Sequence, residues 1–82
     1  MKTINEKDNN IVYHIVGKNI KKYRKLNNLT QQQLADKCHL SVGFISDLES
    51  NTFRTISLNT IYVISKELNI NIKQLFDELK ED

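Results

Sequence analysis

The sequence predicts a small, compact all-α domain, and three observations support this prediction. The 82 residues contain no proline and only two glycines, so few positions would interrupt a helix. Apolar residues recur at steps of three and four, which is the spacing of one face of an α-helix. Four Ser, Thr or Asn residues each precede such a segment, where helices prefer to begin. A chain of this length is one domain with a thin stability margin, which dimerisation would increase.

The first helix is expected over residues 10–26, after a polar stretch, residues 1–9, that should form a flexible N-terminal tail. Asn27 and Asn28 should end this helix, because asparagine tolerates the left-handed conformation that closes many helices. Its apolar positions follow mixed three- and four-residue steps: Ile11, Val12, Ile15, Val16, Ile20 and Tyr23.

The four later helices should begin with the same capping device. A polar side chain caps each helix, and apolar residues on either side of the cap pack together as a hydrophobic staple. Gln33 and Gln74 stand three residues after their caps and complete capping boxes. These starts and the first helix predict five helices in one domain, residues 10–82. The caps are Thr30, Ser41, Ser57 and Asn71, and the staples are Leu29 with Leu34, Leu40 with Ile45, Ile56 with Ile61, and Ile70 with Leu75.

Residues 29–50 predict a helix–turn–helix. Two short helices are separated only by the run Cys38-His39-Leu40-Ser41, in which position 39 should take the left-handed conformation. Histidine adopts this conformation more readily than most non-glycine residues, so the tight turn can form. In a helix–turn–helix the first helix is braced and the second enters the DNA major groove. DNA binding is therefore the leading functional hypothesis.

The charge of the chain is unevenly distributed. Residues 1–40 carry eight Lys and Arg against three acids, a net charge of +5, whereas residues 41–82 carry four against seven, a net charge of −3. Such an imbalance marks either a solvated helix face or a phosphate-facing patch, and the neighbouring helix–turn–helix favours the phosphate-facing patch. Five positive residues lie close together on the first helix: Lys18, Lys21, Lys22, Arg24 and Lys25.

Other functional classes lack their usual residues. His14, Cys38 and His39 do not have the spacing of a zinc site, and the sequence has no glycine-rich phosphate loop or nucleophile elbow. We therefore expect no enzymatic activity, no cofactor and no metal. No apolar run approaches the length of a membrane span, and the first residues lack the apolar block of a signal peptide. A single cysteine excludes an internal disulfide, so a cytoplasmic protein is expected.

The stretch from Val16 to about Leu79 resembles the Xre/Cro/cI-like helix–turn–helix family of bacterial and phage regulators. The resemblance lies in Val16-Gly17, Ile20 and Arg24, followed by the runs LTQQQLA, LSVGFISDLE and SLNTIYVISKELNI. It implies a lambda-repressor-like fold in which the first helix is extended at residues 10–15. That extension can pack on its own domain or widen a dimer contact.

The resemblance implies a set of DNA-binding residues. Gln31 matches a glutamine that contacts a phosphate from a helix N-terminus, and Arg54 lies in a loop that approaches phosphate in the family. The outward residues of the third helix match base-reading positions. Together with the basic patch, the predicted DNA-binding residues are Thr30, Gln31, Ser41, Val42, Gly43, Phe44, Ser46, Asp47, Asn51, Arg54, Lys21 and Lys25.

The predicted base-reading face departs from the usual pattern. Arg, Gln and Asn make bidentate bonds to bases, but here Val42 offers only apolar contact and Gly43 has no side chain. Asp47 can accept a hydrogen bond from cytosine N4, and it also repels phosphates. Recognition is therefore expected to depend on DNA shape, water and backbone contacts, or on a surface other than this helix.

The resemblance also implies two structural contacts. Arg24 and Glu49 match positions that the family pairs in a partly buried salt bridge between the first and third helices, although Arg24 can also simply join the basic face. The C-terminal end of the domain is implied to form a symmetric homodimer, the alternative being that its apolar residues are buried within one monomer. The predicted interface residues are Tyr62, Ile70, Ile72, Phe76 and Leu79.

These predictions describe a homodimeric, sequence-specific regulator of transcription on a palindromic operator, acting as repressor or activator. The size of the chain and its runs SVGFISDLES and TISL resemble the controller proteins of restriction–modification systems. RNA polymerase is then a further candidate partner. Two alternatives remain open. An antitoxin of this fold would mainly bind a small partner protein, and a DNA-coating protein would bind without sequence preference.

Overall fold

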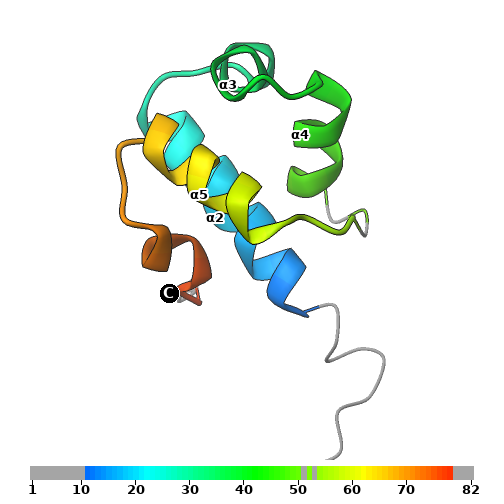
Figure 1. Cartoon of the computed structure of the whole chain (residues 1–82), viewed down its shortest axis with the longest axis vertical. Coiled ribbons are helices and arrows are strands. Elements are labelled where there is room, and N and C mark those ends of the chain that lie inside the picture. Colours follow the sequence, from blue (N-terminus) through cyan, green and yellow to red (C-terminus); the bar gives the residue numbers. More distant parts are fainter. Residues whose placement is uncertain (1–10, 51, 53, 79–82) are drawn as a thin grey trace, which may run out of the picture.

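The computed structural model describes residues 11–50, 52 and 54–78, and every regular element in this part of the chain is helical. The expected tail, residues 1–9, and the predicted site residues Asn51 and Leu79 lie outside it. The all-α prediction is confirmed. Figure 1 shows the elements in order: α2 (Ile11–Leu26), α3 (Gln31–Cys38), α4 (Val42–Glu49), α5 (Leu58–Glu67) and the 3-10 helix η1 (Ile72–Phe76).

The prediction of a fifth α-helix is wrong, because η1 is a five-residue 3-10 helix. Its cap is as predicted, since the Asn71 side chain accepts from the Lys73 amide and Gln74 completes the capping box. The Nδ2 group of Asn19, however, donates to the carbonyl oxygens of Leu75 (3.0 Å) and Asp77 (2.7 Å). Those carbonyls would be acceptors in a longer α-helix, and Asp77 instead takes an extended conformation.

The other predicted helix starts are also confirmed. Thr30 accepts from the Gln33 amide and forms the reciprocal capping box. The Ser41 and Ser57 side chains each accept a backbone N–H from the third residue after them. Because each start satisfies its own amide groups locally, the helix boundaries depend little on distant contacts.

Within the described ranges, three non-glycine residues take the left-handed conformation and separate the helices. Asn28 (φ 57°) follows α2 and His39 (φ 58°) closes α3, as the sequence predicts. Asn69 (φ 59°) follows α5, and no prediction was made for it. At His39 the cap amide donates to the Ala35 and Asp36 carbonyls, which keeps the turn between α3 and α4 short.

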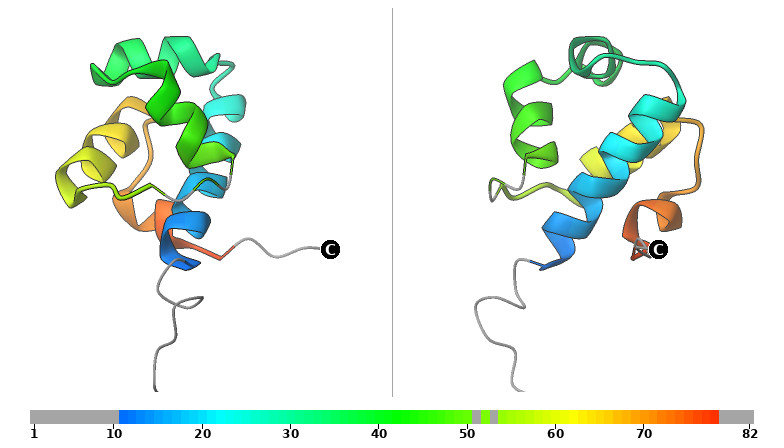
Figure 2. Two further views of the ribbon diagram at one scale, coloured as in Figure 1. Left: turned by 90° about the vertical axis from the view of Figure 1, so that its right-hand side faces the viewer. Right: turned by 180° about the vertical axis from the view of Figure 1, so that it is seen from behind.

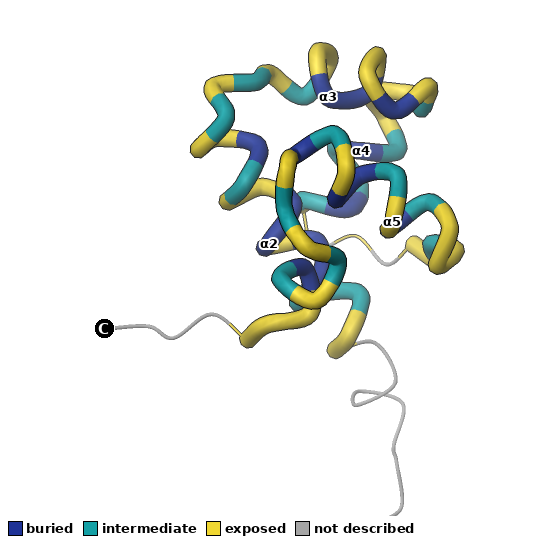
Figure 3. The backbone as a smooth tube through the Cα atoms, turned by 60° about the vertical axis from the view of Figure 1, so that its left-hand side comes forward, coloured by how far each residue is buried: buried dark blue, intermediate teal, exposed yellow. Residues whose placement is uncertain are grey.

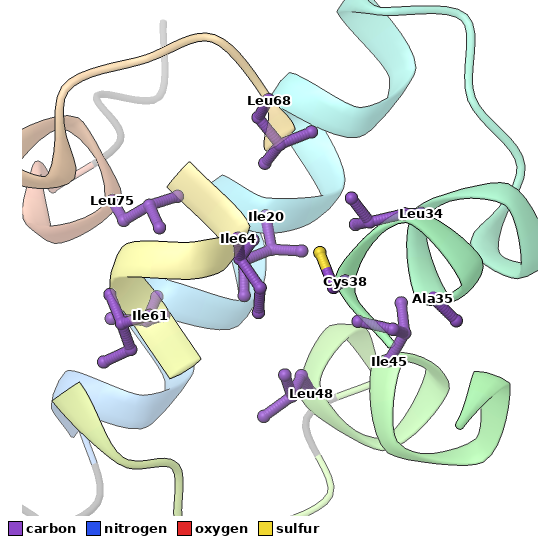
Figure 4. Packing of buried hydrophobic residues seen from close by; sticks show 11 residues of the cluster. Ile20, Leu34, Ala35, Cys38, Ile45, Leu48, Ile61, Ile64, Leu68 and Leu75 are labelled. Atoms are coloured by element: carbon purple, nitrogen blue, oxygen red, sulfur yellow. The ribbon is translucent and has the colours of Figure 1, made fainter. Parts of the chain in front are cut away.

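The core is a single cluster to which all five elements contribute (Figure 4). In Figures 1 and 2, α4 and η1 lie on opposite sides of α2, while α3 packs against both α4 and α5. Figure 3 shows that buried positions of the helices turn toward this centre. The buried hydrophobic residues are Val16, Ile20, Leu34, Ala35, Cys38, Ile45, Leu48, Ile61, Ile64, Leu68 and Leu75.

A row of polar side chains on α2 and the turn directly after it, which we call the polar seam, holds the C-terminal segment in place. It consists of Asn19, Tyr23 and Asn27, spaced one helical turn apart. Asn19 binds the carbonyls around the end of η1, and Asn27 donates to the Leu68 carbonyl at 3.1 Å. The Tyr23 hydroxyl accepts from Gln74 Nε2 at 3.3 Å. The first and last described elements are thus joined by hydrogen bonds as well as by apolar contact.

Cys38 fills core space, and we predict that its thiol is unreactive in the folded protein. Burial, followed by the nearby charge of Glu67, raises the pKa of Cys38 from 9.0 to about 11. The thiolate fraction at pH 8 is then about a hundredfold lower than in the unfolded chain. A maleimide should label folded protein far more slowly than urea-unfolded protein. Because the pKa of Cys38 is higher in the folded protein, the thiol ionises first in the unfolded chain. The free energy of unfolding is therefore unaffected by this thiol below pH 9 and falls as pH rises from 9 toward 11.

Equal labelling rates for the folded and urea-unfolded chains at pH 8 would contradict this placement of Cys38. A Cys38→Ala variant gives the background rate for the measurement.

Candidate nucleic-acid interface

α4 has one buried and one open side. Ile45 and Leu48 are buried in the core and fix the helix from within. On the opposite side Val42 is exposed, and among the described residues no atom of another element lies within 4 Å of the place where a Gly43 side chain would begin. Ser46 and Asp47 are partly exposed. The side of α4 predicted to read bases is therefore free to meet a ligand.

The C-terminal end of α4 rests directly on α2. A β-carbon at Gly17 would overlap the carbonyl oxygen of Leu48 and lie 2.9 Å from its carbonyl carbon. Glycine is required here for close approach of two backbones, since its φ is not in the left-handed region. This contact sets how far α4 stands from the first helix.

The predicted pair of Arg24 and Glu49 is confirmed. Arg24 Nε donates to Glu49 Oε2 at 2.7 Å and Nη2 donates to Oε1 at 2.8 Å, which is a bidentate geometry. Arg24 Nη1 also donates to the Leu29 carbonyl at 2.7 Å, ahead of α3. The hydrogen bond that Arg24 donates to the Glu49 carboxylate raises the pKa of Arg24, and burial opposes this rise. Arg24 is therefore a brace between α2, α3 and α4, and it does not belong to the exposed basic face.

Gln31, predicted to contact phosphate, is held by the same carboxylate. Its Nε2 donates to Glu49 Oε1 at 3.1 Å, so the brace reaches the first turn of α3. Phosphate contact by Gln31 or by the capped N-terminus at Thr30 stays a prediction. A phosphate there would meet a glutamine whose position is already restricted.

Asp47 and Arg54 form an ion pair that the sequence analysis did not anticipate. Arg54 Nη1 lies 2.8 Å from Asp47 Oδ2, and the Arg54 guanidinium lies over the Phe44 ring at 5.0 Å from its centre. All three residues were predicted to contact DNA, and the structure brings Arg54 against Phe44 and Asp47 of α4. The sequence shows that Asp47 and Arg54 have opposite charges, but it does not predict that they meet. The residues between the end of α4 and Arg54 follow no helical or strand pattern from which their relative positions could be inferred.

Four lysines of α2 share one exposed face, as predicted for the basic patch. With His14, Glu49 and Ser50 they line an open depression of about 560 Å³ beside the end of α4. The Lys22 ammonium lies over the Tyr23 ring, 5.0 Å from its centre. The basic face, defined as Lys18, Lys21, Lys22 and Lys25, therefore adjoins α4.

The predicted dimer residues are only partly exposed. Tyr62 is 50% exposed and Phe76 is 39% exposed, whereas Ile70 and Ile72 pack half-buried against the core. Leu58, at the start of α5, is 73% exposed and was missed, because its helical spacing also suits the core. Lys66 lies over the Tyr62 ring at 5.7 Å. An apolar surface thus remains on α5 and η1.

Comparison with known proteins decides the family. The family model described as Helix-turn-helix, HTH_3, matches residues 20–75. The chain belongs to this helix-turn-helix family. It is accordingly a DNA-binding regulator of transcription, in a family of regulators rather than enzymes. The match covers α3, α4 and α5 and the C-terminal part of α2 from Ile20 onward, including Arg24 and Glu49.

The relatives of this helix-turn-helix protein include controllers of restriction–modification systems. Control protein C.BamHI from Bacillus amyloliquefaciens is 38% identical over 64 residues, covering 77% of this chain and 78% of that protein. The structure of the restriction–modification controller C.AhdI from Aeromonas hydrophila matches with a TM-score of 0.72 at 25% identity. The match covers 78% of this chain and 96% of C.AhdI. The structure of SinR, a regulator of biofilm formation from Bacillus subtilis solved in complex with DNA, matches with a TM-score of 0.71 at 27% identity. The match covers 76% of this chain and 98% of the SinR chain.

In the described part of the chain, no three His, Cys, Asp or Glu side chains come together in a way that would hold a metal ion. None of the described helices is long and apolar enough to cross a membrane.

Proposed function

We propose that this protein binds a palindromic operator as a homodimer and controls transcription of a restriction–modification operon. The observation that carries the proposal is the braced and open α4: its inner side is fixed by the core and by Arg24–Glu49, while its outer side is free. A helix held in this way can enter the major groove without rearranging the domain. The likeness to C.BamHI and C.AhdI supports a role in restriction–modification control.

In this proposal the positive residues around α4 bind the DNA backbone. Lys21 and Lys25 stand on the basic face beside the end of α4, and Arg54 lies along its outer side. Gln31 and the capped start of α3 would meet a phosphate from the other direction. Since phosphate contacts position a protein without reading sequence, these residues set the register in which α4 is presented.

The outer side of α4 would make few direct hydrogen bonds to bases. Val42 and Gly43 provide none from their side chains, so only Ser46 and Asp47 offer polar groups on the outer side of α4. DNA shape and bridging water therefore contribute a large part of the specificity. We place this activity in the cytoplasm, where a free thiol such as Cys38 stays reduced.

The homodimer would use the apolar surface on α5 and η1. Leu58, Tyr62 and Phe76 are exposed there, and a second copy related by a two-fold axis would cover the same residues on both subunits. Because α4 lies across α2 from η1, the recognition helices would remain on the outside of such a dimer. They would then reach major grooves about 34 Å apart.

The proposal is tested by measuring binding to the DNA upstream of the protein's own gene and to a scrambled duplex of equal length, across a salt series. Tight binding to the upstream duplex alone supports a sequence-specific regulator. Equal affinity for both duplexes with a steep salt dependence would indicate DNA coating instead. If neither duplex binds and a second protein co-purifies at fixed stoichiometry, the antitoxin alternative replaces the proposal.

We predict that charges in the apolar surface separate the subunits. The double substitution Tyr62→Glu and Phe76→Glu should weaken dimerisation tenfold or more, because each introduces a carboxylate into an interface that excludes water. Sedimentation at several concentrations measures the change, and circular dichroism checks the fold. Leu26→Glu, at an exposed leucine on α2, is the matched control. A parent chain that stays monomeric at tens of micromolar, with and without DNA, would reject the homodimer.

A further inference from the structure

The outer side of α4 carries a carboxylate whose charge is already compensated. Asp47 is paired with Arg54 at 2.8 Å, and Phe44, one turn earlier on α4, supports the guanidinium from the other side. Ser50 Oγ donates to the Asp47 carbonyl and lies 3.2 Å from the Thr52 hydroxyl, which ties the start of the loop to the helix. The side chains of Asp47 and Arg54 are 37% and 47% exposed. Such a pair is weak and can open.

The two partners of this pair have different preferences on DNA. In the major groove a carboxylate accepts a hydrogen bond from cytosine N4 and finds no donor on guanine or thymine edges. Adenine offers its N6 donor only beside the N7 acceptor, which repels a carboxylate. A carboxylate in the groove without a positive partner is repelled by the DNA phosphates. A guanidinium is a bidentate phosphate ligand, and Arg54 uses one of its five N–H groups for Asp47 in the ion pair.

We propose that Asp47 and Arg54 exchange partners on DNA, which makes Asp47 the residue that selects cytosine. This rests on the proposed DNA-binding function. Where α4 meets a cytosine, its N4 amino group takes the place of Arg54 on Asp47, and Arg54 turns to a phosphate while Phe44 supports its stem. At other bases the ion pair stays closed, Asp47 adds no repulsion, and Arg54 adds no phosphate contact.

The exchange couples base reading to phosphate binding. Each opened pair adds one phosphate contact per subunit, so the dependence of log affinity on log salt should be steeper by about 0.9 per subunit on cytosine sites. A closed pair adds nothing to this slope. Reading through Asp47 alone, without exchange, would leave the slope the same on all sites.

The experiment uses the intact protein and a set of operator duplexes in which each position facing α4 carries each of the four base pairs. The parent should prefer cytosine at one position per half-site by about tenfold. Asp47→Asn should move that preference to adenine, whose N6 and N7 suit an amide, and should tighten binding to the remaining duplexes. Arg54→Ala should remove the phosphate contact on cytosine duplexes and leave Asp47 uncompensated on the others, so binding weakens on both kinds of duplex and the difference in salt slope disappears. Lys73→Ala, which removes an exposed charge on η1, should change neither the preference nor the difference in slope.

Unchanged base preference in Asp47→Asn, or salt slopes in Arg54→Ala that still differ between cytosine and other duplexes, would overturn the exchange while leaving DNA binding intact. A parent that does not distinguish the operator from scrambled DNA would instead overturn the proposed function, and the exchange with it.

Discussion

Replacing Arg24 with alanine should lower the free energy of unfolding by about 3–5 kcal/mol, because it leaves the Glu49 carboxylate buried without its charge partner. The Glu49 side chain is only 2% exposed, and of its side-chain hydrogen bonds to described residues only that from Gln31 would remain. The Leu29 carbonyl would also lose its bond from Arg24. Urea unfolding followed by circular dichroism measures the change.

Two companion variants separate the brace from a general effect of charge removal. Arg54→Ala removes an exposed ion pair and should change the free energy of unfolding by less than about 1 kcal/mol. The double variant Arg24→Met with Glu49→Leu should recover much of the stability lost in Arg24→Ala, since no unpaired charge is then buried. Comparable losses in Arg24→Ala and Arg54→Ala would show that the buried pair does not brace the domain.

Gly17→Ala is expected to destabilise the domain by about 2–3 kcal/mol, although alanine is the better helix former. The added β-carbon would overlap the Leu48 carbonyl, so the end of α4 must move away from α2. The backbone contact cannot relax as a flexible side chain would. Because α4 moves, DNA affinity should also fall under conditions where the variant is folded, which filter binding or fluorescence anisotropy can measure.

Gly43→Ala is the control for this substitution. Gly43 also lies in a helix, but no other described element lies within 4 Å of the added atom. Alanine should therefore raise the free energy of unfolding by about 0.5–1 kcal/mol. If the free energy of unfolding falls in Gly17→Ala and rises in Gly43→Ala, close approach rather than helix propensity decides the effect at Gly17. A change in the same direction in both variants would contradict this explanation.

The sequence predicts the helix boundaries of this domain well because they are set locally. Thr30, Ser41 and Ser57 each bind an amide three residues away, and His39 closes a turn within its own four residues. Such signals are complete within one short window of sequence. The resemblance to a family added the Arg24–Glu49 contact, whose partners are 25 residues apart and share no local pattern.

The features that escaped prediction depend on tertiary structure. The role of Asn19 could not be foreseen, since an asparagine on a helix gives no sign that it will meet carbonyl groups 56 and 58 residues later. Those bonds also explain why η1 is shorter and tighter than the predicted α-helix. In the candidate site, Asp47 and Arg54 were each identified, but their pairing joins a helix residue to one seven positions later, beyond the end of α4, where no local pattern indicates it.

The polar seam has a consequence for the order in which the chain folds during synthesis. Asn19 and Tyr23 leave the ribosome more than 50 residues before the groups that they bind, and closing such long loops is entropically unfavourable until the intervening core has formed. We expect the polar side chains of α2 to remain without these partners until η1 has been synthesised. Nascent chains that end before Leu75 would therefore lack a completed fold. DNA binding by a new copy would then begin only once the residues of η1 have been synthesised, some time after α3 and α4 have left the ribosome.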